Sequence, residues 1–154
     1  MSGQCTFRVG DLLALPFPDR AFPVVLSYRV LSHLAEWPRF LSELTRVAER
    51  AVVIEYASSR SVNVGAPLLF GLKRQLEGDS RPFLCFRESE LVDEGRRHGF
   101  APCDRYPQFF LPMALHRALD LPRFSPRIEA AARRVGLTTL FGSPVILKLI
   151  RTAG

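Results

Sequence analysis

A short apolar run at residues 24–26, Val-Val-Leu, constrains the fold of this chain more than any other feature. A proline-rich loop precedes the run, and a continuous apolar run of this kind is typical of a strand buried on both faces of a parallel sheet. Polar residues follow directly at 27–29, and again at Ser32 and His33. In open α/β sheets, ligands bind beyond the carboxyl ends of the strands. The run therefore predicts a buried strand and the edge at which a ligand site lies.

The next segments predict a crossover unit. Apolar residues from Trp37 to Ala48 follow the i, i+3, i+4, i+7 spacing of an amphipathic helix, which leaves Glu43 and Arg46 on its outer face. The apolar run at 51–54 predicts a second buried parallel strand. A strand, a helix and a strand in this order form a right-handed crossover. Further helices are expected at 67–76, 88–98, 113–119 and 126–135, and further strands at 100–111 and 144–150.

Composition narrows the class of protein. A chain of 154 residues is one domain by length, and 47% hydrophobic with 23% charged residues is typical of a globular protein. The formal charge of +6 comes largely from arginines that are scattered along the sequence, so binding to nucleic acid is not expected. No apolar run reaches the roughly 18 residues of a spanning helix, and the N-terminus has no signal-peptide core. We therefore expect a soluble, cytoplasmic protein.

Cysteine and histidine spacing gives no metal signature. The three cysteines form no C-x-x-C pair, and the three histidines form no H-x-x-x-H pair. Neither a zinc site nor a disulfide framework is predicted.

The stretch at residues 10–34, GDLLALPFPDRAFPVVLSYRVLSHL, joins an acid, a proline-rich loop, an apolar run and a histidine in a fixed order. It resembles the class I methyltransferases that use S-adenosylmethionine, in particular the small-molecule group that includes the ubiquinone and menaquinone C-methyltransferases. Two positions depart from that family, which commonly has Asp in place of Pro23 and often His or Glu in place of Ser32. A weaker resemblance continues at 51–55 and 99–100.

This resemblance implies an α/β fold, a Rossmann-like methyltransferase sheet that is truncated at the N-terminus and ends in an antiparallel strand pair. The family holds the amino-acid end of the cofactor on a glycine-rich turn, but no G-x-G pattern occurs among the ten glycines here. Ten residues precede Asp11, whereas one βαβ unit takes roughly 30 residues. We therefore expect residues 1–154 to form a single, partial domain that lacks the first half of the cofactor site.

The resemblance also implies S-adenosylmethionine as the cofactor. It places Asp11 and Leu12 at the adenine, where the carboxylate accepts from the amino group and the Leu12 amide pairs with the ring. Ser27 and Tyr28 would face the methionine part and the methyl group. The residues alone leave other interpretations open, because Asp commonly caps a turn and Tyr28 could simply pack under the following helix.

Methyl transfer from a sulfonium is an in-line displacement, so the enzyme mainly positions two reactants and excludes water. A general base is needed only when the nucleophile must lose a proton. His33 is the histidine next to the predicted edge and is a candidate base, although a structural hydrogen bond is the alternative role. His116 and Phe109 are candidates for a substrate pocket, with a helix end packed on an edge strand as the alternative.

The predicted function is S-adenosylmethionine-dependent methyl transfer to a small, partly apolar molecule. The alternative is a non-catalytic fragment or interaction module that needs another chain to complete the cofactor site. Strands run in the order 3-2-1-4-5-7-6 in the resembled family, so the strand at 24–26 would have an unpaired parallel edge. Exposed edges invite pairing, so association with another chain through this edge is also expected.

Overall fold

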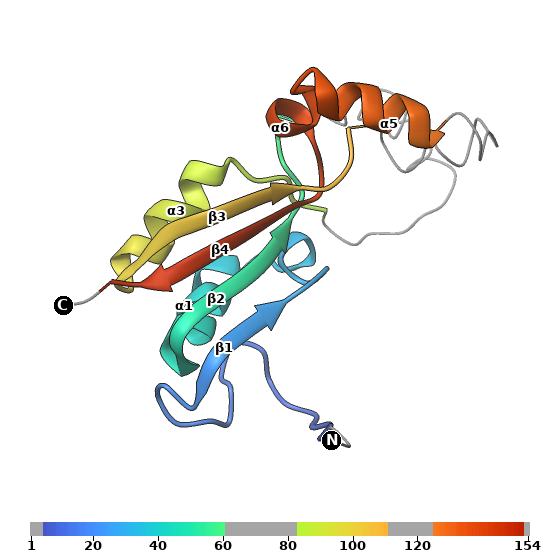
Figure 1. Ribbon diagram of the computed structural model, residues 1–154. Helices are drawn as coiled ribbons and strands as arrows, with labels where there is room; N and C mark the ends of the chain where they lie inside the picture. Colours follow the sequence, from blue (N-terminus) through green and yellow to red (C-terminus); the bar gives the residue numbers. More distant parts are fainter. Residues whose placement is uncertain (1–4, 61–82, 111–124, 153–154) are drawn as a thin grey trace.

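A computed structural model of the protein describes residues 5–60, 83–110 and 125–152 (Figure 1). Its strands form one sheet in the order β1-β2-β4-β3. The elements in chain order are β1 (Phe22–Ser27), the short 3₁₀-helix η1 (Leu31–His33), α1 (Trp37–Val47), β2 (Ala48–Tyr56), α3 (Glu88–Arg97), β3 (Phe100–Pro107), α5 (Ser125–Arg134), α6 (Leu137–Phe141) and β4 (Val145–Arg151).

The pairing of the strands confirms the predicted α/β topology. β1 and β2 are parallel, with Val25 opposite Val52, and α1 connects them. β4 is antiparallel to both of its neighbours, β2 and β3. The last two strands of the chain therefore form the expected antiparallel pair beside β2. A register shift follows Pro102 in the edge strand β3, as expected for a proline that cannot donate to the ladder.

The core lies on one face of the sheet, under α1 and α3 (Figure 1). Alternate residues of β2 and β4 point into it, and Val52, Ile54 and Leu149 are fully buried. From the helices come Leu41 and Leu91, also with no exposed area. Alternation along the strands and helical spacing along α1 and α3 thus converge on one apolar layer. The core also includes Leu31, Phe40, Leu44, Ala48, Tyr56, Phe86, Val92, Phe100, Val145 and Leu147.

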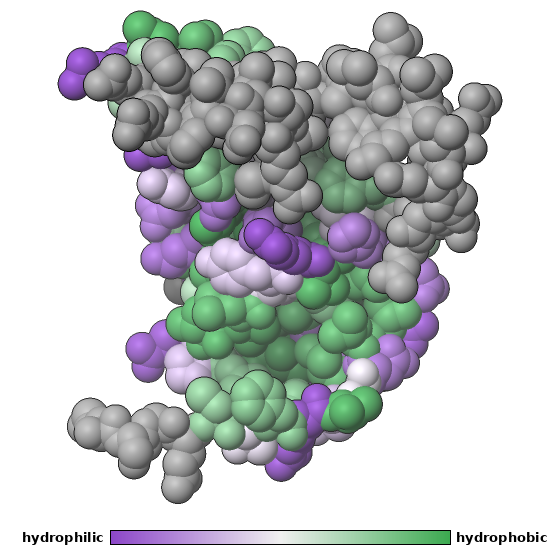
Figure 2. Space-filling view, turned by 90° about the vertical axis from the view of Figure 1, so that its right-hand side faces the viewer, coloured by the Kyte–Doolittle hydropathy of each residue, from purple (hydrophilic) through white to green (hydrophobic). Residues whose placement is uncertain are grey.

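The opposite face of the sheet corrects one prediction. Val24 is 50% exposed and Leu26 is 62% exposed, while Val25 on the other face is partly buried, so β1 is not buried on both faces. The reason is that, among the described elements, none packs against this face, and β1 is an edge strand. Figure 2 shows a broad hydrophobic area on the side of the molecule where β1 lies. A continuous apolar run therefore cannot reveal whether a second helical layer is present.

Nearby residues determine where α3 begins and ends. The side chain of Glu90 accepts a hydrogen bond from the N–H of Arg87, which satisfies a donor at the start of the helix. Gly99 has a φ of +75° and ends the helix, as the sequence predicts. None of the described helices has both the length and the apolar character that a bilayer span requires.

The C-terminal region differs in part from the expectation. The helix expected at 126–135 is present as α5, which ends at Arg134, and Val135 after it is 71% exposed. The short helix α6 was not predicted. The helices expected at 67–76 and 113–119 lie outside the described residues, as does His116.

We predict that truncation of neighbouring residues of β4 separates the two faces of the sheet. Leu149→Ala removes a fully buried side chain and should cost about 2–5 kcal/mol of the free energy of unfolding. Ile150→Ala is the matched control on the open face, where the side chain is 38% exposed, and should cost about 1 kcal/mol or less. Urea unfolding of both variants measures the difference. Equal losses would mean that the open face is covered in solution.

Candidate functional site

The carboxyl end of β1 carries unusual polar groups. Ser27 is buried, and its hydroxyl oxygen has no hydrogen-bond partner within the described residues. Tyr28 follows and is 44% exposed. Arg29 then has a φ of +58°, a left-handed conformation that is uncommon for a residue with a side chain. Orphaned polar atoms and strained backbone are features that collect at functional sites.

The loop before β1 contains the predicted adenine contacts. The Asp11 carboxylate accepts a hydrogen bond from the N–H of Leu13 at 2.8 Å through Oδ1, and its backbone carbonyl accepts from the N–H of Ala14 at 3.3 Å. Asp11 therefore caps a turn. Its other oxygen, Oδ2, makes no hydrogen bond to the described residues and remains able to accept one. Leu12 is 41% exposed beside it.

An apolar hollow of about 480 Å³ lies next to this turn. Leu12, Phe17 and Phe22 contribute apolar side chains to it. Phe22 begins β1, whereas Ser27 ends it, so five residue steps of roughly 3.3 Å separate them along the strand. The structure thus places the Asp11 turn near the start of β1 and the Ser27 group at its end, and no described contact joins the two.

Glu43 and Arg46 on α1 hold the same loop, although the sequence suggested that they face solvent. Glu43 Oε2 accepts a hydrogen bond from the N–H of Leu15 at 2.8 Å, and the Arg46 carbonyl accepts from the N–H of Arg20 at 2.8 Å. Hydrogen bonding from the Arg46 side chain holds the pKa of Glu43 below its ordinary value. A signal was present in the sequence, because Pro16 has no N–H to offer and carbonyls in such a loop need side-chain donors.

A second polar cluster lies at the end of β2. The Tyr56 hydroxyl donates to Glu88 Oε2 at 2.7 Å, and Arg105 donates to the same oxygen through Nε at 2.5 Å. Arg105 also donates to the carbonyl of Thr139 in α6 at 2.6 Å. Four elements, β2, α3, β3 and α6, are thereby joined at this edge. Burial, followed by the hydrogen bond to Glu88, raises the pKa of Tyr56.

The structure describes two of the three residues predicted as base or substrate contacts. His33 is exposed in η1, with its ring edge against Phe83 at a centroid distance of 5.7 Å. Phe109 is 39% exposed after β3, and its carbonyl accepts from the N–H of Ser143 at 2.7 Å. His116 lies outside the described residues. In the described ranges, no three His, Cys, Asp or Glu side chains gather in a way that would hold a metal ion.

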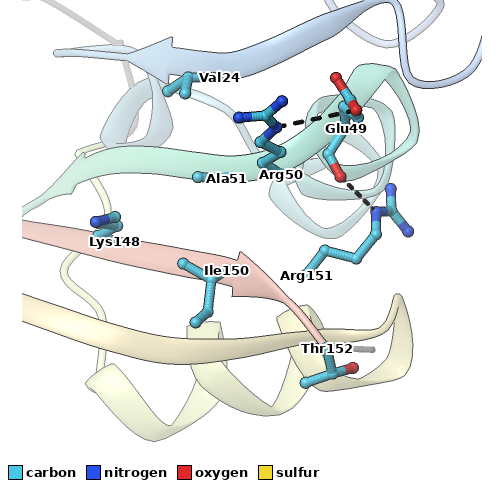
Figure 3. A pocket seen from close by; sticks show the side chains of 8 residues that line it. All are labelled: Val24, Glu49, Arg50, Ala51, Lys148, Ile150, Arg151 and Thr152. Atoms are coloured by element: carbon cyan, nitrogen blue, oxygen red, sulfur yellow. Dashed lines mark hydrogen bonds and ion pairs between the residues drawn. The ribbon is translucent and has the colours of Figure 1, made fainter. Parts of the chain in front are cut away.

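The hollow in Figure 3 lies at the other end of the sheet. It sits on the open face between β1, β2 and β4, with Val24, Ala51 and Ile150 among its apolar residues. Glu49 forms an ion pair with Arg50 at 3.9 Å, and its carbonyl accepts from Arg151 Nε at 3.0 Å (Figure 3). These residues start β2 and end β4, far from the carboxyl edge. Its lining residues include none of those that line the hollow beside the Asp11 turn.

Comparison with known proteins finds a family match for the N-terminal third of the chain. Residues 1–54, which include the Asp11 turn and all of β1, match the family described as a methyltransferase domain. The chain is 39% identical over 133 residues to ajmaline N-methyltransferase from Rauvolfia serpentina, an alignment that covers 86% of this chain and 42% of that protein. The chain thus spans less than half of the length of this curated relative.

Solved structures share the fold at low sequence identity. Magnesium protoporphyrin IX methyltransferase from Synechocystis, solved with bound S-adenosylhomocysteine, has a TM-score of 0.59 and 17% identity, and the match covers 96% of this chain and 51% of that one. The [4+2]-cyclase SpnF has a TM-score of 0.55 and 21% identity, with 96% of this chain and 56% of that one covered. Because a cyclase shares the fold, the fold alone does not specify the reaction.

We predict that Tyr56 stays protonated in the folded chain under conditions in which a free tyrosine ionises. Because folding raises its pKa above the ordinary 10.0, the unfolded chain releases this proton first. The contribution of Tyr56 to the free energy of unfolding is therefore complete below about pH 10 and decreases as the pH rises further. Ultraviolet titration of the phenolate should give the same folded-state curve for wild type and Tyr56→Phe. In denaturant the variant should lack one titrating group, and a missing group in the folded state would contradict the prediction.

Proposed function

We propose, from the premise that this chain belongs to the class I S-adenosylmethionine-dependent methyltransferase family, that it serves methyl transfer from S-adenosylmethionine to a small, partly apolar molecule. The narrower placement among the ubiquinone and menaquinone C-methyltransferases stays a prediction. The observation that carries the proposal is the Asp11 turn, which combines a carboxylate oxygen able to accept a hydrogen bond with an adjacent apolar hollow.

The described residues fit the adenine part of the cofactor. An adenine ring needs an apolar surface and an acceptor for its amino group, and the hollow beside Leu12 and Phe17 offers the surface. Asp11 Oδ2 would accept from the amino group, while Oδ1 continues to cap the turn. The backbone amide of Leu12 would pair with a ring nitrogen. These assignments support a cofactor role for the same carboxylate that holds the turn.

Ser27 and Tyr28 would hold the other end of the cofactor. The Ser27 hydroxyl is buried without a partner in the described residues, so a polar ligand group would satisfy it. The half-exposed ring of Tyr28 would lie against the sulfonium, whose positive charge an aromatic face stabilises. S-adenosylmethionine, when bound, supplies an electrophilic methyl group. The task of these side chains is then to orient it toward the acceptor and to exclude water.

The acceptor is proposed to bind at the carboxyl edge of the sheet. Figure 1 shows α5 and α6 beyond the ends of β1, β2 and β3. Phe109, Leu140 and Phe141 expose apolar area there, between 39% and 62% of each residue, which suits a partly apolar molecule. His33 is exposed after the end of β1 and would accept a proton from an acceptor that must lose one. His116, the other proposed substrate residue, lies outside the described part of the chain.

The glycine-rich portion of the site would meet this chain at β1. Within the described residues, the outer edge of β1 has no partner strand, and its backbone groups are available for parallel pairing. We propose that the segment that holds the methionine end of the cofactor pairs along this edge. The same edge is a feature in favour of a non-catalytic module, which we do not favour because the Asp11 turn already fits a ligand.

We predict that the chain binds S-adenosylhomocysteine with micromolar affinity in calorimetric titration. Asp11→Asn keeps an oxygen to cap the turn but places an amide donor where the adenine amino group needs an acceptor. It should weaken binding at least about tenfold, since hydrogen bonds to charged groups contribute roughly 1.5–3 kcal/mol. Asp11→Ala should weaken binding at least as much.

Asp93→Asn is the matched control, because Asp93 is an exposed acid on α3. It should bind as wild type does. Normal binding by Asp11→Asn together with loss in Asp11→Ala would reduce Asp11 to a turn cap. A folded wild-type chain that binds nothing would overturn cofactor binding by this chain alone and direct the search to a partner for the edge of β1.

A further inference from the structure

Arg46 on α1 makes more contacts than a surface ion pair requires, and apart from Glu43 its side-chain partners lie in the loop before β1. We propose that Arg46 is a positioning residue for the cofactor, because its guanidinium fixes the loop of residues 15–20 and thereby the Asp11 turn. This inference rests on the proposed function, in which Asp11 and Leu12 contact the adenine.

All five N–H donors of the guanidinium are used. Nε donates to Glu43 Oε1 at 2.8 Å, and Nη2 donates to Glu43 Oε2 at 2.8 Å. Nη2 also donates to the Leu15 carbonyl at 3.0 Å. Nη1 donates to the Phe17 carbonyl at 2.8 Å and to Asp19 Oδ1 at 2.9 Å. The bidentate pair with Glu43 fixes the plane of the guanidinium, and the remaining three donors hold the loop.

The proline-rich sequence explains why the loop needs such a donor. The two carbonyls that Arg46 binds belong to Leu15 and Phe17, the residues that precede Pro16 and Pro18. Prolines have no N–H, so this segment cannot join a regular strand ladder, and its partly buried carbonyls must find donors elsewhere. The two carbonyls that precede the prolines are therefore placed so that one guanidinium donates to both.

We call the hydrogen bonds from Glu43 and Arg46 to residues 15–19 the clamp. The clamp is linked to Asp11 by a short, continuous set of hydrogen bonds. Leu13 and Ala14 donate their N–H groups to Asp11 and close the turn. The next residue, Leu15, is held at its N–H by Glu43 and at its carbonyl by Arg46. The turn is therefore followed directly by Leu15, the first residue that Glu43 and Arg46 hold. Release of Leu15 would also free Asp11.

Lysine cannot replace this arginine. The two loop carbonyls and the Glu43 carboxylate accept from all three nitrogens of the guanidinium, whose five donors are held in one fixed plane. An ammonium is a single point with three donors, so it would serve one part of this set and leave the other unsatisfied. The Arg46–Glu43 contact alone, in contrast, is an ordinary i,i+3 ion pair.

The test combines hydrogen exchange with binding of S-adenosylhomocysteine to the complete chain. In Arg46→Lys, the hydrogen-bonded amides of the loop should exchange about tenfold faster or more, while those of β2 and β4 keep their protection. The loop amides are those of Leu13, Ala14, Leu15, Phe17 and Arg20. Affinity for S-adenosylhomocysteine should decrease by a similar factor. In Arg46→Ala, millimolar methylguanidinium should restore slow exchange and affinity, an effect that general destabilisation would not produce. Arg96→Lys, which changes an exposed i,i+3 pair with Asp93, is the matched control and should alter neither.

Unchanged exchange of the loop in both variants would overturn the clamp. Faster exchange with unchanged affinity would overturn the positioning role and leave Arg46 as a structural contact. If the wild-type chain binds no S-adenosylhomocysteine, the proposed function fails for this chain and the cofactor half of the inference fails with it. The exchange data then still decide whether Arg46 holds the loop, so the two failures are distinguishable.

Discussion

One-sided burial of the two central strands is the constraint on which the other features of this structure depend. β2 and β4 lie between neighbours on both sides, and α1 and α3 cover the same face of them. Residues such as Val52 and Leu149 have no exposed area, and burial of this kind supplies most of the favourable free energy of folding. Along β2 and β4, successive side chains alternate between this buried face and the open face.

Polar side chains at the two ends of the sheet have different surroundings. At the amino end, Arg151 donates to the carbonyls of Thr45 and Ala48 and lies over the ring of Phe100, so its charge serves the fold. At the carboxyl end, the Tyr56 cluster satisfies its own groups but Ser27 does not. An unsatisfied hydroxyl next to left-handed backbone costs stability, and the sheet tolerates that cost because its core is formed elsewhere. Polar groups at both ends of the sheet thus mainly serve the fold, whereas the Ser27 hydroxyl is left without a partner among the described residues.

The sequence predicted correctly those features that depend only on neighbouring residues. The helical spacing after Trp37 and the stop at Gly99 depend on a few neighbouring residues, and both are confirmed. The exposure of Val24 was predicted wrongly, because an apolar run carries no information on whether a second layer covers it. Strand pairing between distant segments was predicted through the resemblance, but side-chain contacts between distant segments were missed. Arg46 meets Leu15 across 31 residues, and its spacing from Glu43 alone suggested only a surface pair.

The clamp also changes how the motif before β1 is understood. A fold shared with a [4+2]-cyclase cannot by itself specify methyl transfer, so the chemistry has to come from particular side chains. Within the motif, the residues from Leu15 to Asp19 contribute mainly backbone carbonyls and one carboxylate to Arg46. These residues must hold one loop shape, and Arg46 on α1 fixes that shape. In the proposed site, Asp11 and Leu12 are the residues before β1 that contact the adenine. The proposed adenine chemistry therefore depends on two residues whose position this loop shape determines.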